Sequence, residues 1–290
     1  MKKDEYLMKK NAYLKGIVRS TYNRQAGLYK EFSKLQKLNL KNLIDHAENW
    51  NTKIIPGLLL DAGCGIPDTS LLKRRIFSGN IHGYIGVDMS FSMLSKSVSI
   101  EPFMRVNADL EAIPFQPESF SVIVSNSVLH WLNYPEQNLS PLKGCKELYN
   151  VLKRKGVFIL SVSGTGTAQR FQKVFFEVSK TVPDSFYSNR SLLRFDPIGS
   201  MALHELIQVL QNSGFTISHA IMEYEPAFYK KTDDYINHVI AYGEEVYLTA
   251  FKSEHRATVW EMISKQFKNI EGEYDYEHDQ YMIYAVALKE

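Results

Sequence analysis

Cysteine is scarce in this sequence: Cys64 and Cys145 are the only two among 290 residues. They are too few, and too unrelated in position, for a disulfide framework or a metal site, so we expect two free thiols and no metal. No apolar run reaches the length of a membrane span, and no signal-peptide core follows the first few residues. These absences argue against a disulfide-stapled or membrane-spanning protein, and we expect a cytoplasmic location.

Repeats and low-complexity tracts are also missing, while apolar residues make up 44% of the chain. This share is ample for the core of one large domain or two modest ones. The net charge of +2 is unevenly distributed: residues 1–45 carry eleven basic and four acidic side chains, which gives +7 there and −5 in the rest. Such a segment would attract an acidic partner, such as nucleic acid or an acidic carrier protein, but a solvated helical face without a partner is an equal alternative.

The most informative stretch is residues 58–69, an apolar run that passes into Asp61-Ala62-Gly63-Cys64-Gly65. This pattern predicts a buried parallel strand that turns sharply into a helix, which is where α/β proteins hold nucleotide-like ligands. Because glycine has no Cβ atom, Gly63 and Gly65 allow positive φ and close approach of a ligand to the backbone amides. A nicotinamide-binding fingerprint would need glycine at position 68, where the chain has Asp68, so the pattern favours a different cofactor.

Two further apolar runs end in acidic residues. Residues 82–88 end in Asp88, which would lie beside the glycine turn and accept hydrogen bonds from a ribose diol. Residues 103–108 are followed by Asp109 and Leu110, a carboxylate and an apolar wall suited to the amino group and ring of adenine. Asp88 taken alone could be a helix N-cap, but three acids after three apolar strands favour a shared ligand crevice.

A fourth apolar strand, residues 119–127, carries Asn126 near its polar end and is followed by His130 and Trp131. This polar end would reach the reacting centre of the crevice. His130 by itself is as typical of a packed or capping residue as of a catalytic one.

The order of these motifs resembles the class I S-adenosylmethionine-dependent methyltransferases over roughly residues 55–165. The resemblance implies S-adenosyl-L-methionine as the cofactor. It places the cofactor contacts on Tyr29, Asp61, Gly63, Cys64, Gly65, Asp88, Met89, Asp109, Leu110 and Asn126. One departure is Gly65-Ile66-Pro67, where the family usually has Gly-Thr-Gly; we interpret Pro67 as a stiffer helix start.

The resemblance also implies an α/β fold: a Rossmann-like, seven-stranded, mostly parallel sheet with an antiparallel final strand and helices on both faces. The pattern predicts strands before Asp61 and at residues 82–88, 103–108, 119–127, 156–163, 214–218 and 280–288, and helices at residues 10–48, 89–97, 135–152, 168–180 and 200–213. We divide the chain into a helical N-terminal arm (1–50), a cofactor-binding core (51–225), a helical insertion (226–275) and the final strand (276–290). Two amphipathic helices in the insertion either cap a substrate pocket or pack against the sheet edge or a dimer partner.

The N-terminal arm resembles that of one particular family within this class of methyltransferases. Residues 20–36 resemble the arm of the malonyl-[acyl-carrier protein] O-methyltransferases of biotin synthesis, with matching positions at Tyr22, Arg24, Ala26, Tyr29, Leu35 and Gln36. Residues 125–131 and 164–167 look similar to the same family, whereas the long insertion and Lys153-Arg154-Lys155-Gly156 depart from it. The resemblance implies carboxyl O-methylation of a malonyl group carried by an acidic acyl-carrier protein that docks on the basic arm. The residues expected to hold the acceptor against the methyl group are Tyr22, Arg24, Tyr29, His130 and Trp131.

Two other interpretations stay open. A methyltransferase of the same fold could act on oxygen or nitrogen of another small molecule, such as a free carboxylic acid. A non-enzymatic interaction protein, or a nucleic-acid-binding module that uses the basic arm, would keep the fold without turnover. Nucleic-acid base methylation is not favoured, because Asn126-Ser127-Val128-Leu129 stands where an Asn-Pro-Pro-Tyr-like motif would be.

Overall fold

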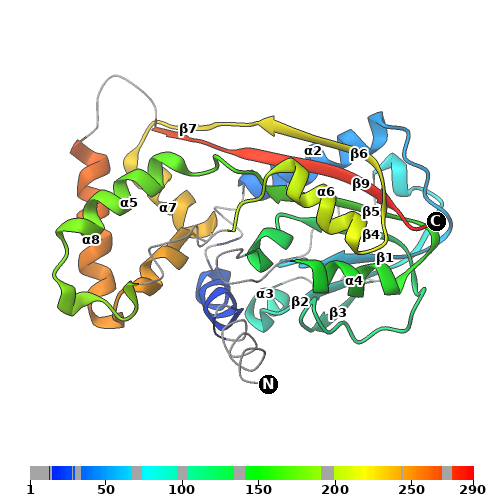
Figure 1. Ribbon diagram of the computed structural model, residues 1–290, viewed down its shortest axis with the longest axis horizontal. Helices are drawn as coiled ribbons and strands as arrows, with labels where there is room; N and C mark the ends of the chain where they lie inside the picture. Colours follow the sequence, from blue (N-terminus) through cyan, green and yellow to red (C-terminus); the bar gives the residue numbers. More distant parts are fainter. Residues whose placement is uncertain are drawn as a thin grey trace.

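A seven-stranded sheet runs through the centre of the structure, a computed structural model that describes residues 13, 15–27, 29, 34–66, 74–96, 103–133, 141–190, 199–242, 244–269 and 276–290 (Figure 1). The strands lie in the order β3-β2-β1-β4-β5-β9-β6. Their bounds are β1 Gly57–Ala62, β2 Ile81–Asp88, β3 Phe103–Asn107, β4 Phe120–Asn126, β5 Leu152–Ser163, β6 Thr216–Tyr224 and β9 Tyr281–Leu288. Strands β1 to β5 pair in parallel, whereas β9 is antiparallel to both β5 and β6. The predicted mostly parallel sheet with an antiparallel final strand is confirmed.

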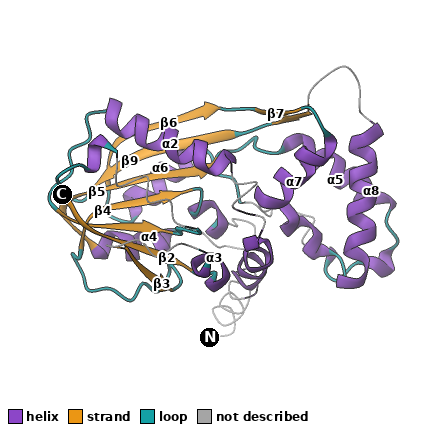
Figure 2. Cartoon of the chain, turned by 180° about the vertical axis from the view of Figure 1, so that it is seen from behind, coloured by secondary structure: helices purple, strands orange, loops and turns teal. Residues whose placement is uncertain are grey.

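Helices cover both faces of this sheet, as predicted (Figure 2). Neighbouring residues of β1 point to opposite faces: Leu60 joins a core with helices α4 (Leu142–Val151) and α6 (Leu203–Asn212), and Leu59 joins a second core with α2 (Lys34–Asn49). Because side chains alternate along a strand, burial of both faces requires a nearly continuous apolar run. The strongly apolar runs that predicted these strands are therefore a consequence of two-sided burial.

A helical lobe lies beyond one end of the sheet (Figures 1 and 2). Its main elements are α5 (Gln169–Thr181), α7 (Thr232–Tyr242), the 3-10 helix η7 (Glu244–Ala250) and α8 (Arg256–Asn269), and they share a separate apolar core. The helices α7 and α8 are the two predicted in the insertion. Two short paired strands, β7 (Ala227–Tyr229) and β8 (Tyr276–His278), continue β6 and β9 toward the lobe and were not predicted.

Several boundaries differ from the prediction. β5 begins at Leu152, four residues early, because Leu152 already pairs with Phe120 of β4. β6 is longer than predicted because it pairs with β9 as far as Tyr224. The helix predicted from residue 135 is α4, which begins at Leu142, and residues 134–140 lie outside the described residues. The helix start predicted at Pro67 also lies outside them.

The helical arm is seen in two described pieces, residues 15–27 and α2. The remaining short helices are η2 Arg75–Phe77, α3 Phe91–Ser95, η3 Leu129–Leu132, η5 Asp184–Phe186 and η8 Ser253–His255. Among the residues that the structure describes, none of the helices combines the length and apolar character that crossing a membrane requires.

Lys289 caps the end of α4. Its ammonium group, on a side chain only 10% exposed, donates to the carbonyl oxygens of Leu152 (2.7 Å) and Tyr149 (3.0 Å). A cation at a helix C-terminus satisfies carbonyl groups that have no partner within the helix. We expect Lys289→Met to lower the free energy of unfolding by about 2 kcal/mol in urea denaturation. Lys146→Met, at an exposed position of the same helix, is the control, and equal midpoints for the two variants would contradict this role.

Candidate functional site

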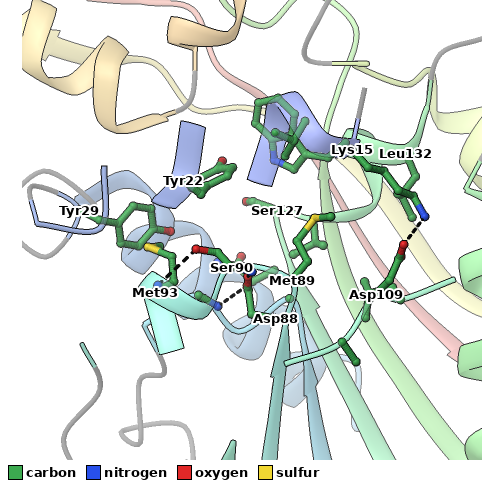
Figure 3. A pocket seen from close by; sticks show the side chains of 18 residues that line it. Lys15, Tyr22, Tyr29, Asp88, Met89, Ser90, Met93, Asp109, Ser127 and Leu132 are labelled. Atoms are coloured by element: carbon green, nitrogen blue, oxygen red, sulfur yellow. Dashed lines mark hydrogen bonds and ion pairs between the residues drawn. The ribbon is translucent and has the colours of Figure 1, made fainter. Parts of the chain in front are cut away.

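A pocket opens at the carboxyl ends of β1, β2, β3 and β4 and is covered by residues 15–27 of the arm, the N-terminal helix (Figure 3). Its walls are formed by Lys15, Val18, Tyr22, Tyr29, Gly63, Gly65, Asp88, Met89, Ser90, Met93, Ala108, Asp109, Leu110, Asn126, Ser127, Val128, Trp131 and Leu132. Strand β1 has β2 on one side and β4 on the other, so this is the point at which the strand order reverses. Ligands of open α/β sheets bind at such a switch point.

The turn after β1 requires glycine. Gly63 has φ +77°, and a Cβ atom there would lie 2.5 Å from the side chain of Val128. The amides of Gly63 and Cys64 both donate to the carbonyl oxygen of Val87, which fixes the turn against β2. Gly65, with φ +55°, presents its backbone to the pocket. The turn can therefore bring main-chain atoms close to a ligand.

Asp88 ends β2 and connects it to this turn. One carboxylate oxygen accepts the amide hydrogen of Gly65 (2.8 Å), and the other accepts that of Ser90 (2.7 Å). Burial raises the pKa of the Asp88 carboxyl, although these two hydrogen bonds act in the opposite direction. A carboxylate has about four lone-pair positions, so both oxygens can accept further hydrogen bonds. Asp88 is thus oriented for a ligand with adjacent hydroxyl groups.

Asp109 lies across the pocket from Asp88, to its right in Figure 3. One of its oxygens accepts the amide hydrogen of Glu111 (2.9 Å), and the other is 2.6 Å from the ammonium nitrogen of Lys15. Lys15 is also 2.8 Å from the carboxylate of Glu111. Leu110, which is buried, adds an apolar wall beside Asp109. The two predicted residues therefore lie together on the pocket wall, with a lysine that was not predicted.

Three aromatic rings line the part of the pocket under the N-terminal helix. The ring of Tyr22 meets those of Trp131 and Tyr29 edge to face, with centroid separations of 5.7 and 6.3 Å. Burial of Tyr29 and the negative charge of Asp88 raise the pKa of its phenol, so the hydroxyl stays protonated. This wall offers apolar surface together with phenolic hydrogen-bond donors.

Four of the predicted site residues do not line the pocket. Asp61 is buried and accepts the hydroxyl hydrogen of Tyr84. Arg24 donates to the Ser20 and Thr21 hydroxyls of its own helix. Burial raises the pKa of the Cys64 thiol, and the charge of Asp61 adds to this, so the thiol stays protonated.

His130 is the fourth predicted site residue that does not line the pocket. Its ring is buried, and Nδ1 accepts the amide hydrogen of Ser163 (3.1 Å) behind the pocket. Burial lowers the pKa of His130 to about 3, which keeps the imidazole neutral. Asn126, in contrast, lines the pocket while its side chain donates to the Gln36 carbonyl oxygen (2.9 Å) and accepts from Ser161 (2.8 Å).

Sequence analysis missed eight pocket residues, namely Lys15, Val18, Ser90, Met93, Ala108, Ser127, Val128 and Leu132. Two of them could have been found. Lys15 and Val18 precede Tyr22 by seven and four positions, a spacing that places all three on one face of a helix. Of the other six, Met93 lies in α3 and Leu132 in η3, and the remaining four lie in loops whose conformation, such as the left-handed φ of 58° at Ser127, no local pattern indicates.

Comparison with known proteins identifies a methyltransferase domain in this part of the chain. Residues 60–160 match the family model described as a methyltransferase domain. A malonyl-[acyl-carrier protein] O-methyltransferase of Methylovorus sp. is 27% identical over 178 residues, and the match covers 57% of this chain and 56% of that protein. The chain thus spans little more than half the length of this curated relative. A human mitochondrial protein named arginine-hydroxylase NDUFAF5 is 31% identical over 111 residues, covering 38% of this chain and 30% of its own.

Among solved structures, a candidate methyltransferase from Bacillus halodurans superposes with a TM-score of 0.53 at 16% identity, covering 87% of this chain and 98% of the other. At this identity the likeness concerns the fold. The glycine turn, Asp88 and Asp109 fit a nucleoside cofactor, because the turn admits close approach and each carboxylate can accept further hydrogen bonds. The chain therefore carries a methyltransferase domain of the class I type, whose cofactor is S-adenosyl-L-methionine.

Proposed function

We propose that this chain transfers a methyl group from S-adenosyl-L-methionine to a carboxylate, and that the acceptor is a malonyl group on acyl-carrier protein. The observation that carries the methyl-transfer step is the pocket itself, in which Asp88 holds the amide of Gly65 beneath the aromatic wall. The name of the Methylovorus relative supports the malonyl acceptor, at 27% identity over 56% of that protein's length.

The cofactor end of the pocket has a residue for each part of the nucleoside. Asp88 would accept hydrogen bonds from the two ribose hydroxyls, and Asp109 would accept one from the adenine amino group beside Leu110. When bound, S-adenosyl-L-methionine supplies a sulfonium methyl group that is already strongly electrophilic. The residues of the chain then need only position the two partners and exclude water.

The acceptor would lie against Tyr22, Tyr29 and Trp131. A malonyl carboxylate is ionised at neutral pH, so its oxygen can form the new bond to the methyl carbon without a general base. The carbon–sulfur bond of the bound cofactor would break in the same step and leave its electron pair on sulfur, so no proton would need to be transferred. His130 is buried outside the pocket wall, and its Nδ1 accepts the amide hydrogen of Ser163, so it is not placed to act as a base on the acceptor.

Methyl transfer from radiolabelled S-adenosyl-L-methionine tests the proposal. Malonyl-carrier protein, malonyl-coenzyme A and free malonate are run side by side. Transfer of label to the carrier protein, followed by its release as methanol on treatment with base, would support the full proposal. Absence of transfer to any malonyl compound, together with measurable binding of S-adenosylhomocysteine, would reject the malonyl acceptor while keeping the cofactor.

A second candidate is a methyltransferase for another small carboxylic acid. One observation favours it: α7 and α8 lie in a long insertion that departs from the malonyl-[acyl-carrier protein] O-methyltransferases that the arm resembles. Faster turnover of a free acid than of malonyl-carrier protein would favour this candidate.

Docking of an acidic carrier would use the basic arm, where Lys34 and Lys37 are exposed on α2. We expect the double charge reversal Lys34→Glu/Lys37→Glu to slow turnover of the carrier-bound substrate about fivefold at low salt, while cofactor affinity stays the same. Lys173→Glu/Lys180→Glu, at two exposed positions of α5, is the matched control. If both pairs had the same effect on turnover, the arm would not be the docking surface.

A further inference from the structure

The N-terminal helix is attached to the sheet at two places, and each lies beside one of the acids proposed to bind the cofactor. Asn23 accepts the hydroxyl hydrogen of Ser90, two residues after Asp88. About two helical turns earlier, Lys15 contacts Asp109. The helix therefore contributes to the pocket wall at the ribose end and at the adenine end.

The contact at the adenine end is a partly buried ion-pair cluster. The side chain of Lys15 is 11% exposed and that of Glu111 is 9% exposed, while Asp109, at 37%, faces the pocket. Lys15 bridges the two carboxylates at 2.6 and 2.8 Å. A backbone amide holds one oxygen of Asp109 and Lys15 holds the other, so the plane of the carboxylate is fixed from both sides. Each oxygen can still accept a hydrogen bond from a ligand.

We infer that Lys15 is a positioning residue that gives the pocket its selectivity for adenine. This inference rests on the proposed function, in which Asp109 accepts the adenine amino group. Without the ammonium group, Asp109 and Glu111 would be two neighbouring carboxylates in a poorly solvated wall, and their repulsion would turn Asp109 away toward solvent. Lys15 acts through Asp109 and has no need to touch the reacting atoms.

Calorimetry with two nucleosides separates selectivity from general affinity. S-adenosylhomocysteine carries the adenine amino group, and S-inosylhomocysteine has a carbonyl oxygen in its place. The wild-type protein should prefer the adenosyl ligand by about tenfold or more, because the inosyl ligand presents an acceptor to a carboxylate. In Lys15→Met we expect this preference to fall about fivefold, mainly through loss of affinity for the adenosyl ligand. Lys15→Arg, which keeps the charge, should restore it.

The control is Lys143→Met. Lys143 reaches the same Glu111 carboxylate at 3.8 Å, but its side chain is 66% exposed and lies outside the pocket wall. This variant should keep the wild-type preference. Equal weakening of both ligands in Lys15→Met, or no change in either, would overturn the inference, because Lys15 would then serve only to anchor the helix or would have no role in binding. If the wild-type protein bound neither nucleoside, the proposed function itself would fail.

Discussion

Asp88→Ala is expected to weaken the binding of S-adenosylhomocysteine by about 100-fold, close to 3 kcal/mol. Two contributions add. The proposed hydrogen bonds from the ribose hydroxyls to a charged acceptor are lost, and the amides of Gly65 and Ser90 lose the oxygens that hold them at 2.8 and 2.7 Å. Both losses fall on the same side of the pocket, so the variant should bind poorly even though the rest of the wall is intact. Isothermal titration calorimetry measures the effect directly.

Two variants show whether the loss is specific. Asp184→Ala removes an exposed carboxylate that pairs with Arg190 on the lobe, and it should bind S-adenosylhomocysteine as the wild type does. Asp88→Asn keeps one oxygen acceptor and should give an intermediate affinity. Wild-type affinity in Asp88→Ala, with unchanged circular dichroism, would mean that the carboxylate serves only to hold the backbone amides of Gly65 and Ser90.

Acidification from pH 7 to pH 5 is expected to cost about 4 kcal/mol of folding stability through two buried histidines. Burial lowers the pKa of His130 and of His278 to about 3 in the folded state, whereas an unfolded histidine has a pKa near 6.5. Between these values the unfolded chain binds protons that the folded chain does not. Stability from this source is therefore fully present above pH 6.5 and is lost as the pH falls, by about 2 kcal/mol per histidine at pH 5.

Other groups modify this pH dependence. Burial also lowers the pKa of His238, whose ring lies 4.6 Å from that of His278, so its contribution has the same sign. The raised pKa of Asp88 acts in the opposite sense. Urea denaturation at pH 7 and pH 5 gives the difference. His278→Asn should reduce that difference by about 2 kcal/mol, whereas His204→Asn, at an exposed position, should leave it unchanged. The same pH dependence in all three proteins would contradict this account.

The sheet and its ligand-binding edge were predictable because they follow from local patterns. Each inner strand is buried on both faces, so it appears as an apolar run, and the residue after the run lies at the same edge as its neighbours. Asp88 and Asp109 were found in this way. The strands β7 and β8 were missed because three-residue strands leave no periodic signal, and their pairing joins segments about fifty residues apart.

The direction of the His130 side chain could not be predicted from the local sequence pattern. A position after a strand indicates nearness to the pocket, but not the direction of the side chain. His130 and Trp131 are adjacent in the 3-10 helix η3, where successive side chains point about 120° apart. Trp131 lines the pocket, whereas His130 turns to Ser163 of β5. The helical spacing from Tyr22 could have placed Lys15 at the pocket, but its ion pair with Asp109 spans 94 positions of the chain and no short motif records it.

The place of β9 between β5 and β6 has a consequence for synthesis on the ribosome. Among the described strands of the sheet, β6 pairs only with β9, yet α7 and α8 are translated between them. At about 5–20 residues per second, β6 therefore waits several seconds before its partner is made. During that time the nascent sheet has an open edge at β5, and β6 has no strand on which to dock. We therefore expect the seven-stranded sheet to become complete only after α7 and α8 have been translated, and a chaperone that shields strand edges would act during that interval.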